Sequence, residues 1–135
     1  MLICGRCNPP PESDPNYRGV YFADRDDLPA HAAAMGGTPL RVEHITQPVG
    51  SVLSAWTALD GSMYALAEIN VQQPGGAMAA ACVTAGRFNE FSLGYTSRMS
   101  RDTSGILNVG NKRIQELSLV RMGARPDCKI ICHEG

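Results

Sequence analysis

The sequence predicts a mainly β domain of the α+β class, a small barrel of about seven strands with few, short helices around it. The chain has 135 residues, enough for one hydrophobic core, and 44% of them are apolar. Segments rich in β-branched and aromatic residues alternate with turns that contain Gly, Pro or Asp, as is typical of short strands. Internal repeats and domain linkers are absent from the sequence, so residues 1–135 are expected to form a single domain.

The N-terminal part is expected to contain an irregular arm, two strands and a helix. Residues 1–15 form the arm, because PPPESDP suits neither a helix nor a central strand. YRGVYFAD (17–24) has the aromatic and β-branched residues of a strand. DDLPAHAAAMGG (26–37) begins with acids and a proline and ends at two glycines, which predicts a short helix. PLRVEH (39–44) alternates apolar and polar residues, as a strand with one buried face does.

The middle of the chain predicts a hairpin and a second helix. VGSVLSAWTA (49–58) and MYALAEINV (63–71) have strand composition. The turn between them, LDGS, contains an Asp-Gly pair, which is a strong hairpin signal. AMAAACVTAGR (77–87) is a helix by its alanine-rich composition.

The C-terminal part predicts three more strands. NEFSLGYTSRM (89–99) and KRIQELSLVRM (112–122) are strands by composition, separated by a flexible loop, SRDTSGILNVGN (100–111). The last segment, DCKIICHEG, contains a short apolar strand and then ends.

The charge pattern argues against two classes of partner. The formal net charge is −1 and there is no run of Lys or Arg, whereas a nucleic-acid binder normally has a basic surplus. The apolar stretches are far shorter than the ~20 residues that cross a bilayer, so no membrane partner is expected. The proline-rich start lacks a secretory pattern, and we therefore expect an intracellular protein.

The five cysteines are an odd number, which argues against a fully paired disulfide framework. Cys4 and Cys7 form CGRC, and Cys128 and Cys132 are followed by His133. Thiolates at these positions suit zinc, so a zinc-tied β-barrel interaction module, or a redox pair, is one alternative. Reduced thiols with no metal or other cofactor are the default expectation for a reducing compartment.

Three residues on different predicted strands have the chemistry of a nucleophile, a base and an orienting acid. Ser92 lies in EFSLGY, His44 ends PLRVEH and Glu116 lies in IQELSLV. A serine hydroxyl is a weak nucleophile until a base removes its proton, and the base works best when a third group fixes its tautomer. Their order along the chain is no objection, because a triad depends on geometry. The residues alone also allow a bystander serine, a structural histidine and a solvated glutamate.

The chain has two further histidines. His31 lies in an alanine-rich predicted helix and is expected at the surface. His133 lies two residues from the end, where fraying opposes accurate catalytic placement.

PLRVEHITQPVGSVLSAWTALDGSMYALAEI resembles the strand-histidine-strand block of the herpesvirus capsid-maturation proteases, the assemblins. The resemblance makes His44 the catalytic histidine. EFSLGYTSR is similar to the nucleophile strand of that family and places the nucleophile at Ser92. Its Gly94 and Tyr95 bring it closer to the Ser-x-Gly-Tyr type of the related tailed-phage prohead proteases.

RIQELSLVRMGAR resembles the block that carries the third triad member and the oxyanion loop. Glu116 stands where the mammalian and avian herpesvirus enzymes have a second histidine, whereas the phage relatives have an acidic residue in a similar Glu-x-Ser-Leu-Val motif. The loop reads Gly123, Ala124, Arg125 in place of Gly-Arg-Arg. The resemblance implies that the backbone N–H of Ala124 and, through a water, the side chain of Arg125 stabilise the oxyanion.

The resemblance implies a serine endopeptidase that cleaves the internal capsid scaffold protein and its own precursor during viral capsid maturation. It would act in the host nucleus for a herpes-like virus, or in the bacterial cytoplasm as a prohead protease for a phage. The family's enzymes have more helices than this chain, including one that forms their active dimer. A homodimer is therefore one possibility that the resemblance leaves open, and these motifs do not imply it. A structural capsid or scaffold protein without catalysis is a further alternative.

Overall fold

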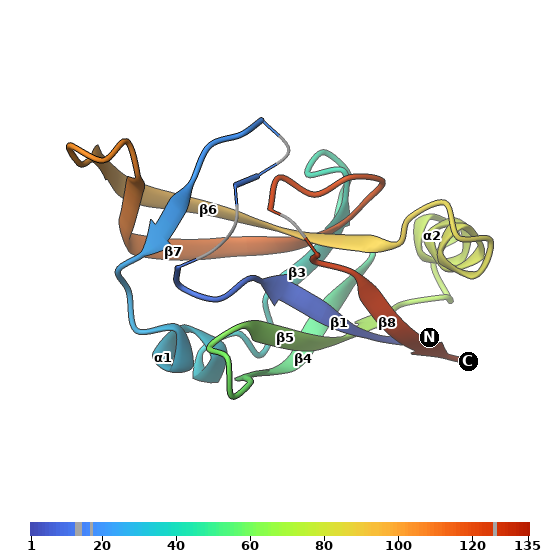
Figure 1. Ribbon diagram of the computed structural model, residues 1–135. Coiled ribbons are helices and arrows are strands. Elements are labelled where there is room, and N and C mark those ends of the chain that lie inside the picture. Colours follow the sequence, from blue (N-terminus) through green and yellow to red (C-terminus); the bar gives the residue numbers. More distant parts are fainter. Residues whose placement is uncertain (13–14, 17, 126) are drawn as a thin grey trace.

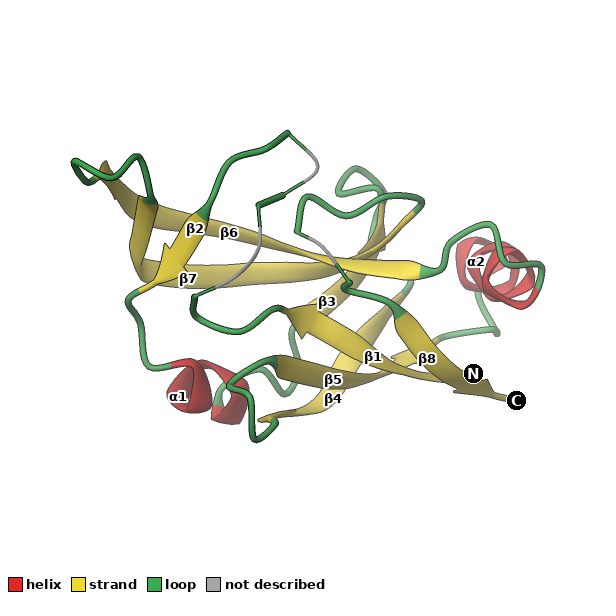
Figure 2. Ribbon diagram, viewed as in Figure 1, coloured by secondary structure: helices red, strands yellow, loops and turns green. Residues whose placement is uncertain are grey.

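Eight strands form one sheet in the computed structural model, which describes residues 1–12, 15–16, 18–125 and 127–135 (Figure 1). The strands are β1 (Leu2–Asn8), β2 (Phe22–Asp24), β3 (Pro39–Val42), β4 (Gly50–Thr57), β5 (Met63–Ile69), β6 (Glu90–Arg101), β7 (Leu107–Val120) and β8 (Ile130–Glu134). Two helices, α1 (Leu28–Ala33) and α2 (Pro74–Thr84), lie outside the sheet (Figure 2). The predicted class, mainly β with short helices, is confirmed.

The sheet is mixed and curls into a half-barrel. Its strand order is β2-β7-β3-β4-β5-β1-β8, and β6 pairs with β7 in addition. Both β2 and β3 run parallel to β7, while the other pairs are antiparallel. The ends of the curl meet where Glu90 bridges Lys129 and the N–H of Phe91 donates to the carbonyl of Cys128 at 2.7 Å. The start of β6 is therefore fixed between β7 and the segment that leads into β8.

The concave side of the sheet contains the hydrophobic core. Fully buried side chains from six strands meet there: Ile3, Leu40, Val52, Met63, Ala65, Ala67, Ile69, Phe91, Leu117 and Leu119. Helix α1 contributes Ala32, and α2 contributes Ala79 and Val83. Within the described residues, neither helix has the length and hydropathy needed to cross a membrane.

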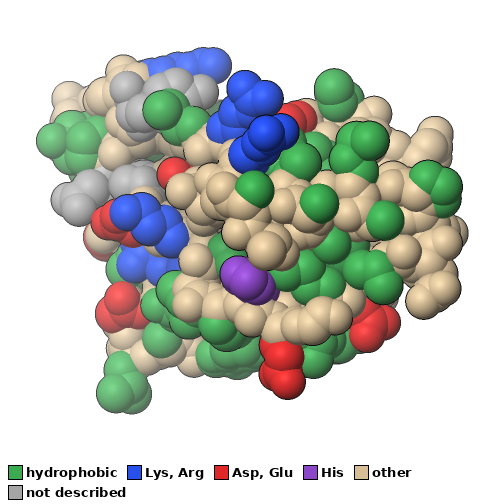
Figure 3. Space-filling model, turned by 90° about the vertical axis from the view of Figure 1, so that its right-hand side faces the viewer, with side chains coloured by type: hydrophobic (Ala, Val, Ile, Leu, Met, Phe, Trp, Pro, Cys, Tyr) green, Lys and Arg blue, Asp and Glu red, His purple; other side chains and the backbone are tan. Residues whose placement is uncertain are grey.

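The outer surface mixes charge and apolar area. On the side that carries α2 and both termini, acidic and basic side chains lie among hydrophobic ones (Figure 3). Several large apolar side chains are exposed, among them Ile45, Leu59, Met78, Met122 and Ile131. Isolated exposures of this kind are normal for a folded domain.

The prediction of an irregular arm over residues 1–15 is wrong for residues 2–8. These residues form β1, which lies inside the sheet between β5 and β8. Ile3, Gly5 and Cys7 alternate toward the core, whereas the prolines that suggested an arm begin only at Pro9. Residues 13, 14 and 17 lie outside the described residues, and of the strand predicted over 17–24 the structure has β2 alone.

The flexible loop predicted over residues 100–111 is also wrong. β6 continues to Arg101 and β7 begins at Leu107, so the two strands form one long hairpin. The connection is tight because the carboxylate of Asp102 accepts from the backbone N–H groups of Ser104 and Ile106, at 2.9 and 3.1 Å. Gly105 takes the positive φ of 85° that this turn requires.

The helices are placed as predicted but have different limits. α1 begins after Asp27, whose side chain accepts from the N–H of Ala30 at 3.1 Å, and is shorter than predicted. α2 begins at Pro74, three residues before the predicted start, since proline fits the first helical turn.

A buried ionic cluster joins three strands to the loop after β7. The carboxylate of Asp24 accepts from Lys112 Nζ, from Asn8 Nδ2 at 3.1 Å and from Arg125 Nη2 at 3.3 Å. The side chains of Asp24 and Lys112 are both 0% exposed. Burial alone would raise the pKa of Asp24, but the charges of Lys112 and Arg125 and these hydrogen bonds outweigh it and hold the pKa below its usual value.

Replacing Lys112 by Met is expected to lower the free energy of unfolding by about 3–5 kcal/mol, because Asp24 would stay buried with part of its pairing lost. Lys129→Met is the matched control, since Lys129 is exposed, and it should change stability by less than about 0.5 kcal/mol. Urea unfolding of both variants measures the difference. Equal, small effects would show that the cluster does not stabilise the fold.

Candidate active site

Neighbouring strands position Ser92 and Glu116 on one part of the sheet. In the antiparallel β6–β7 pair, Ser92 lies opposite Ser118 and Gly94 opposite Glu116. On the other edge of β7, Arg41 of β3 pairs with Ser118 in parallel register. Because paired residues project to the same face, the hydroxyl of β6, the carboxylate of β7 and the guanidinium of β3 come close together.

A strained turn after β3 carries His44. Glu43 and His44 both have positive φ, 52° and 64°, a region that non-glycine residues seldom adopt. The turn is closed by Val42, whose N–H donates to Thr46 Oγ1 at 2.9 Å, and the N–H of His44 donates to Ser118 Oγ at 3.1 Å. Left-handed residues of this kind persist where surrounding contacts hold them, and they cluster at functional sites.

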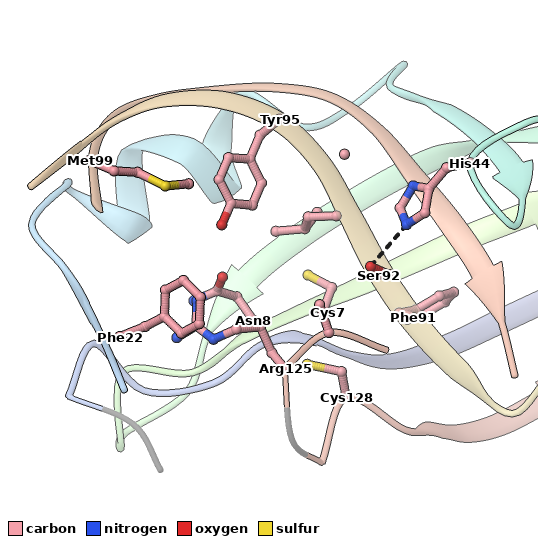
Figure 4. Close-up of a pocket in the computed structure, with 13 residues that line it drawn as sticks. Cys7, Asn8, Phe22, His44, Phe91, Ser92, Tyr95, Met99, Arg125 and Cys128 are labelled. Atoms are coloured by element: carbon pink, nitrogen blue, oxygen red, sulfur yellow. Dashed lines mark hydrogen bonds between the residues drawn. The ribbon is translucent and has the colours of Figure 1, made fainter. Parts of the chain in front are cut away.

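The imidazole of His44 lies between Ser92 and Glu116 and contacts both. Its Nε2 lies 3.0 Å from Ser92 Oγ (Figure 4), and its Nδ1 contacts Glu116 Oε1. Ser118 Oγ donates to the same carboxylate oxygen at 3.0 Å. With Nδ1–H donating to the carboxylate, Nε2 is left as the acceptor for the serine proton. The structure therefore brings together Ser92, His44 and Glu116, and the arrangement allows proton transfer from the hydroxyl to the ring.

Gly94 leaves the space that Glu116 occupies. A Cβ atom on Gly94 would lie 2.4 Å from Glu116 Cγ and 2.7 Å from Glu116 Oε1. Any larger residue would push the carboxylate away from its present position. Gly94 comes two residues after Ser92, and Glu116 lies on the neighbouring strand. These two residues together are a feature of the sequence that points to a buried carboxylate beside the serine.

Arg41 is a further residue of the site, and no motif in the sequence marks it. Its Nε lies 3.2 Å from Glu116 Oε2, and its Nη1 donates to the carbonyl of Thr46 at 2.6 Å. The alternation in PLRVEH puts Arg41 on the polar face of its strand but does not reveal its partner.

A cavity of about 320 Å³ adjoins Ser92 and His44 (Figure 4). Much of its lining is apolar or aromatic, including Phe22, Phe91, Leu93, Tyr95 and Met99. The cavity is large enough to take up the side chain of a bound peptide next to the serine.

Two buried thiols, Cys7 and Cys128, also line this cavity. Burial raises the pKa of Cys128 to about 11, and burial raises the pKa of Cys7 as well. The thiolate is the reactive form of cysteine, so both are inert as nucleophiles near neutral pH. Ser92, which contacts a base, is the better candidate.

The loop after β7 lies against the start of β6. The N–H of Gly123 donates to Glu90 Oε1 at 3.1 Å. Glu90 comes two residues before Ser92 in β6. Ala124 and Arg125 both line the cavity beside the serine. The loop predicted to bind the oxyanion is thus next to the candidate nucleophile.

The guanidinium of Arg125 lies at the far end of the cavity from Ser92. Nη2 is 3.3 Å from Asp24 Oδ2, and the guanidinium carbon lies 4.6 Å from the centroid of the Phe22 ring. In Figure 4 this side chain lies on the Phe22 side of the cavity. A water-mediated role of Arg125 at the oxyanion stays a prediction, and it requires the side chain to reach back from Asp24.

The structure gives no support to the alternative of a zinc site built from Cys4, Cys7, Cys128 and Cys132. Cys4 and Cys7 are three residues apart on β1, so their side chains lie on opposite faces. Cys4 pairs with Cys132 of β8, whereas Cys7 lies in the cavity with Cys128. Among the described residues, no three His, Cys, Asp or Glu side chains are grouped to hold a metal ion.

The other two histidines are elsewhere. His31 is half-buried in α1, with Nε2 3.5 Å from Asp26 Oδ2. His133 is exposed on β8, where it pairs with Ile3.

Comparison of the whole fold identifies viral proteases as structural neighbours. The protease of Kaposi's sarcoma-associated herpesvirus, in complex with a hexapeptide phosphonate inhibitor, superposes with a TM-score of 0.65 over 98% of this chain at 16% identity. The chain spans 65% of that protein's length. Structures of the same protease with a dimer disruptor and with an allosteric inhibitor give TM-scores of 0.60 and 0.59 at 17% and 19% identity. Both superpositions cover 99% of this chain, and they cover 77% and 78% of the neighbours' chains.

No protein-family model matches the chain, and no curated protein matches its sequence. The similarity therefore lies in the fold. This half-barrel is similar to the fold of the Kaposi's sarcoma-associated herpesvirus protease, an assemblin.

Proposed function

We propose that this chain is a serine endopeptidase of the assemblin type, with Ser92 as nucleophile, His44 as base and Glu116 as the orienting acid. The observation that carries the proposal is the contact of one imidazole with both partners, Nε2 with Ser92 Oγ at 3.0 Å and Nδ1 with Glu116. The similarity to the fold of a viral protease supports it independently.

In the proposed reaction, Ser92 Oγ attacks the scissile carbonyl while its proton passes to His44 Nε2. The carboxylate of Glu116 stabilises the imidazolium that forms. Collapse of the tetrahedral intermediate breaks the C–N bond, and His44 returns the proton to the leaving amine. A water then attacks the acyl-serine with His44 again as base, which releases the acid product and restores the hydroxyl.

The proposed oxyanion donors are on the loop that Glu90 holds against β6. The backbone N–H of Ala124 is the first donor, and the side chain of Arg125 would act through a water. Loss of one such donor typically lowers turnover by ~10²–10³.

The proposed substrates are the internal capsid scaffold protein and the enzyme's own precursor. The complex of the structural neighbour with a hexapeptide phosphonate supports a peptide substrate, and its complex with a dimer disruptor supports a homodimer. Both are proposals for this chain, as are the host nucleus and the bacterial cytoplasm as alternative places of action.

One observation favours the tailed-phage variant of this function. Glu116 fits because Gly94 lies opposite it, and the two residues belong to the Ser-x-Gly-Tyr and Glu-x-Ser-Leu-Val patterns that resemble prohead proteases. The two variants share one chemistry and differ in the virus and the scaffold.

A fluorophosphonate is expected to label the folded chain at a single residue, Ser92, because its hydroxyl contacts the imidazole of His44 beside the cavity. Ser92→Ala should abolish labelling, and His44→Ala should slow it by at least ~10³. Intact mass and peptide mapping give the stoichiometry and the site, and labelling is repeated in a salt that favours association. A folded wild-type chain that takes no label in either condition, or an adduct elsewhere, would contradict the proposal.

Gly94→Ala is expected to slow labelling by roughly 10–100-fold, because the new Cβ displaces the carboxylate that orients His44. Gly110→Ala is the matched control, since Gly110 is also in the β6–β7 hairpin but a Cβ there meets no atom closer than 4.0 Å. Labelling rates of both variants are compared with Glu116→Gln after thermal melts confirm folding. A wild-type rate for Gly94→Ala would show that the position of Glu116 does not matter for the reaction.

A further inference from the structure

We propose that Arg41 is a positioning residue for the candidate triad: it fixes the carboxylate of Glu116 toward His44 and ties down the turn that carries the histidine. This inference rests on the proposed function and names a residue that the family resemblance does not supply.

The two oxygens of Glu116 have different partners. Oε1 accepts from Ser118 Oγ at 3.0 Å and contacts His44 Nδ1, while Oε2 faces Arg41 Nε at 3.2 Å. With both oxygens engaged, the plane of the carboxylate is fixed. The Glu116 side chain is 12% exposed, so water contributes little to its solvation and the cation of Arg41 offsets the cost of keeping it charged.

The same guanidinium holds the histidine turn. Arg41 Nη1 donates to the carbonyl of Thr46 at 2.6 Å, and Thr46 Oγ1 accepts from the N–H of Val42. Within this closed turn lie the two residues with positive φ, Glu43 and His44. A planar guanidinium with several donors can bridge a carboxylate and a carbonyl at fixed geometry, which an ammonium group does less well.

The charge of Arg41 also affects the imidazolium that forms on His44 during the reaction. Besides Glu116, the ionisable groups near the site include Glu43 of the histidine turn and Glu90 below the oxyanion loop, and Tyr95, Arg125, Cys7 and Cys128 line the cavity. Burial raises the pKa of Tyr95 and of both thiols, so these three stay neutral near pH 7, and Arg125 is paired with Asp24. Without Arg41, the negative charge of Glu116 would be less compensated and would stabilise the imidazolium formed in the reaction more strongly.

Two variants of the full chain separate charge from geometry. Arg41→Met should slow fluorophosphonate labelling at pH 7 by about tenfold and move the acid limb of its pH profile to higher pH. Arg41→Lys keeps the positive charge, so the acid limb of the pH profile should not move, while the labelling rate falls by about threefold. Arg113→Met is the matched control, because Arg113 is an exposed arginine on the same strand as Glu116, and it should change neither.

An independent readout needs no catalysis. The pH titration of the His44 ring is followed by NMR in wild type, Arg41→Met and Arg41→Lys, with folding checked by thermal melts. Its midpoint is expected to lie at higher pH in Arg41→Met alone. If the wild type takes no label but this midpoint still rises, the proposed function fails and the role of Arg41 stands.

Three results would overturn the inference. A wild-type labelling rate and an unchanged pH profile in Arg41→Met would show that the contact between Arg41 and Glu116 has no functional effect. If Arg41→Met and Arg41→Lys slowed labelling equally and neither changed its pH profile, Arg41 would have only a structural role. An unmoved NMR midpoint in Arg41→Met would contradict it even where labelling succeeds.

Discussion

Strand β7 sets the geometry of the candidate site, because it pairs with β6 along one edge and with β2 and β3 along the other. The β6 register puts Gly94 beside Glu116, and the β3 register puts Arg41 beside Ser118. A one-residue shift of the β6 register would turn Ser92 to the face opposite Glu116, and the same shift of the β3 register would turn Arg41 away from it. The serine, the carboxylate and the strand that leads to His44 are therefore held by one set of backbone hydrogen bonds.

A glutamate as third member needs both space and charge compensation. Gly94 supplies the space, since its missing side chain leaves the volume that the Glu116 methylene and carboxylate fill. Arg41 and Ser118 supply the polar contacts that a mostly buried carboxylate needs. These three residues form one unit with Glu116, and a substitution at one of them is expected to change the effect of a substitution at another.

The sequence was informative where local pattern and motif agree, and less so where contacts are long-range. Strands β4 and β5 follow from composition and from the Asp60-Gly61 turn, and the three site residues follow from motif resemblance. Strand β1 was missed because Gly5 and Cys7 are weak strand signals next to a proline-rich segment. The contact of Arg41 with Glu116 depends on parallel pairing between distant segments, which no local pattern reveals. For the same reason the spacing of Cys4 and Cys7 suggested a zinc site, although a strand directs the two side chains to opposite faces.

The most direct test of the proposed active site is a crystal structure of the chain after reaction with a peptide phosphonate. The expected result is a bond from phosphorus to Ser92 Oγ, with His44 still between that oxygen and Glu116 and a phosphonyl oxygen facing the N–H of Ala124. A phosphonate bound elsewhere, or an adduct in which His44 has turned away from Ser92 and Glu116, would contradict it.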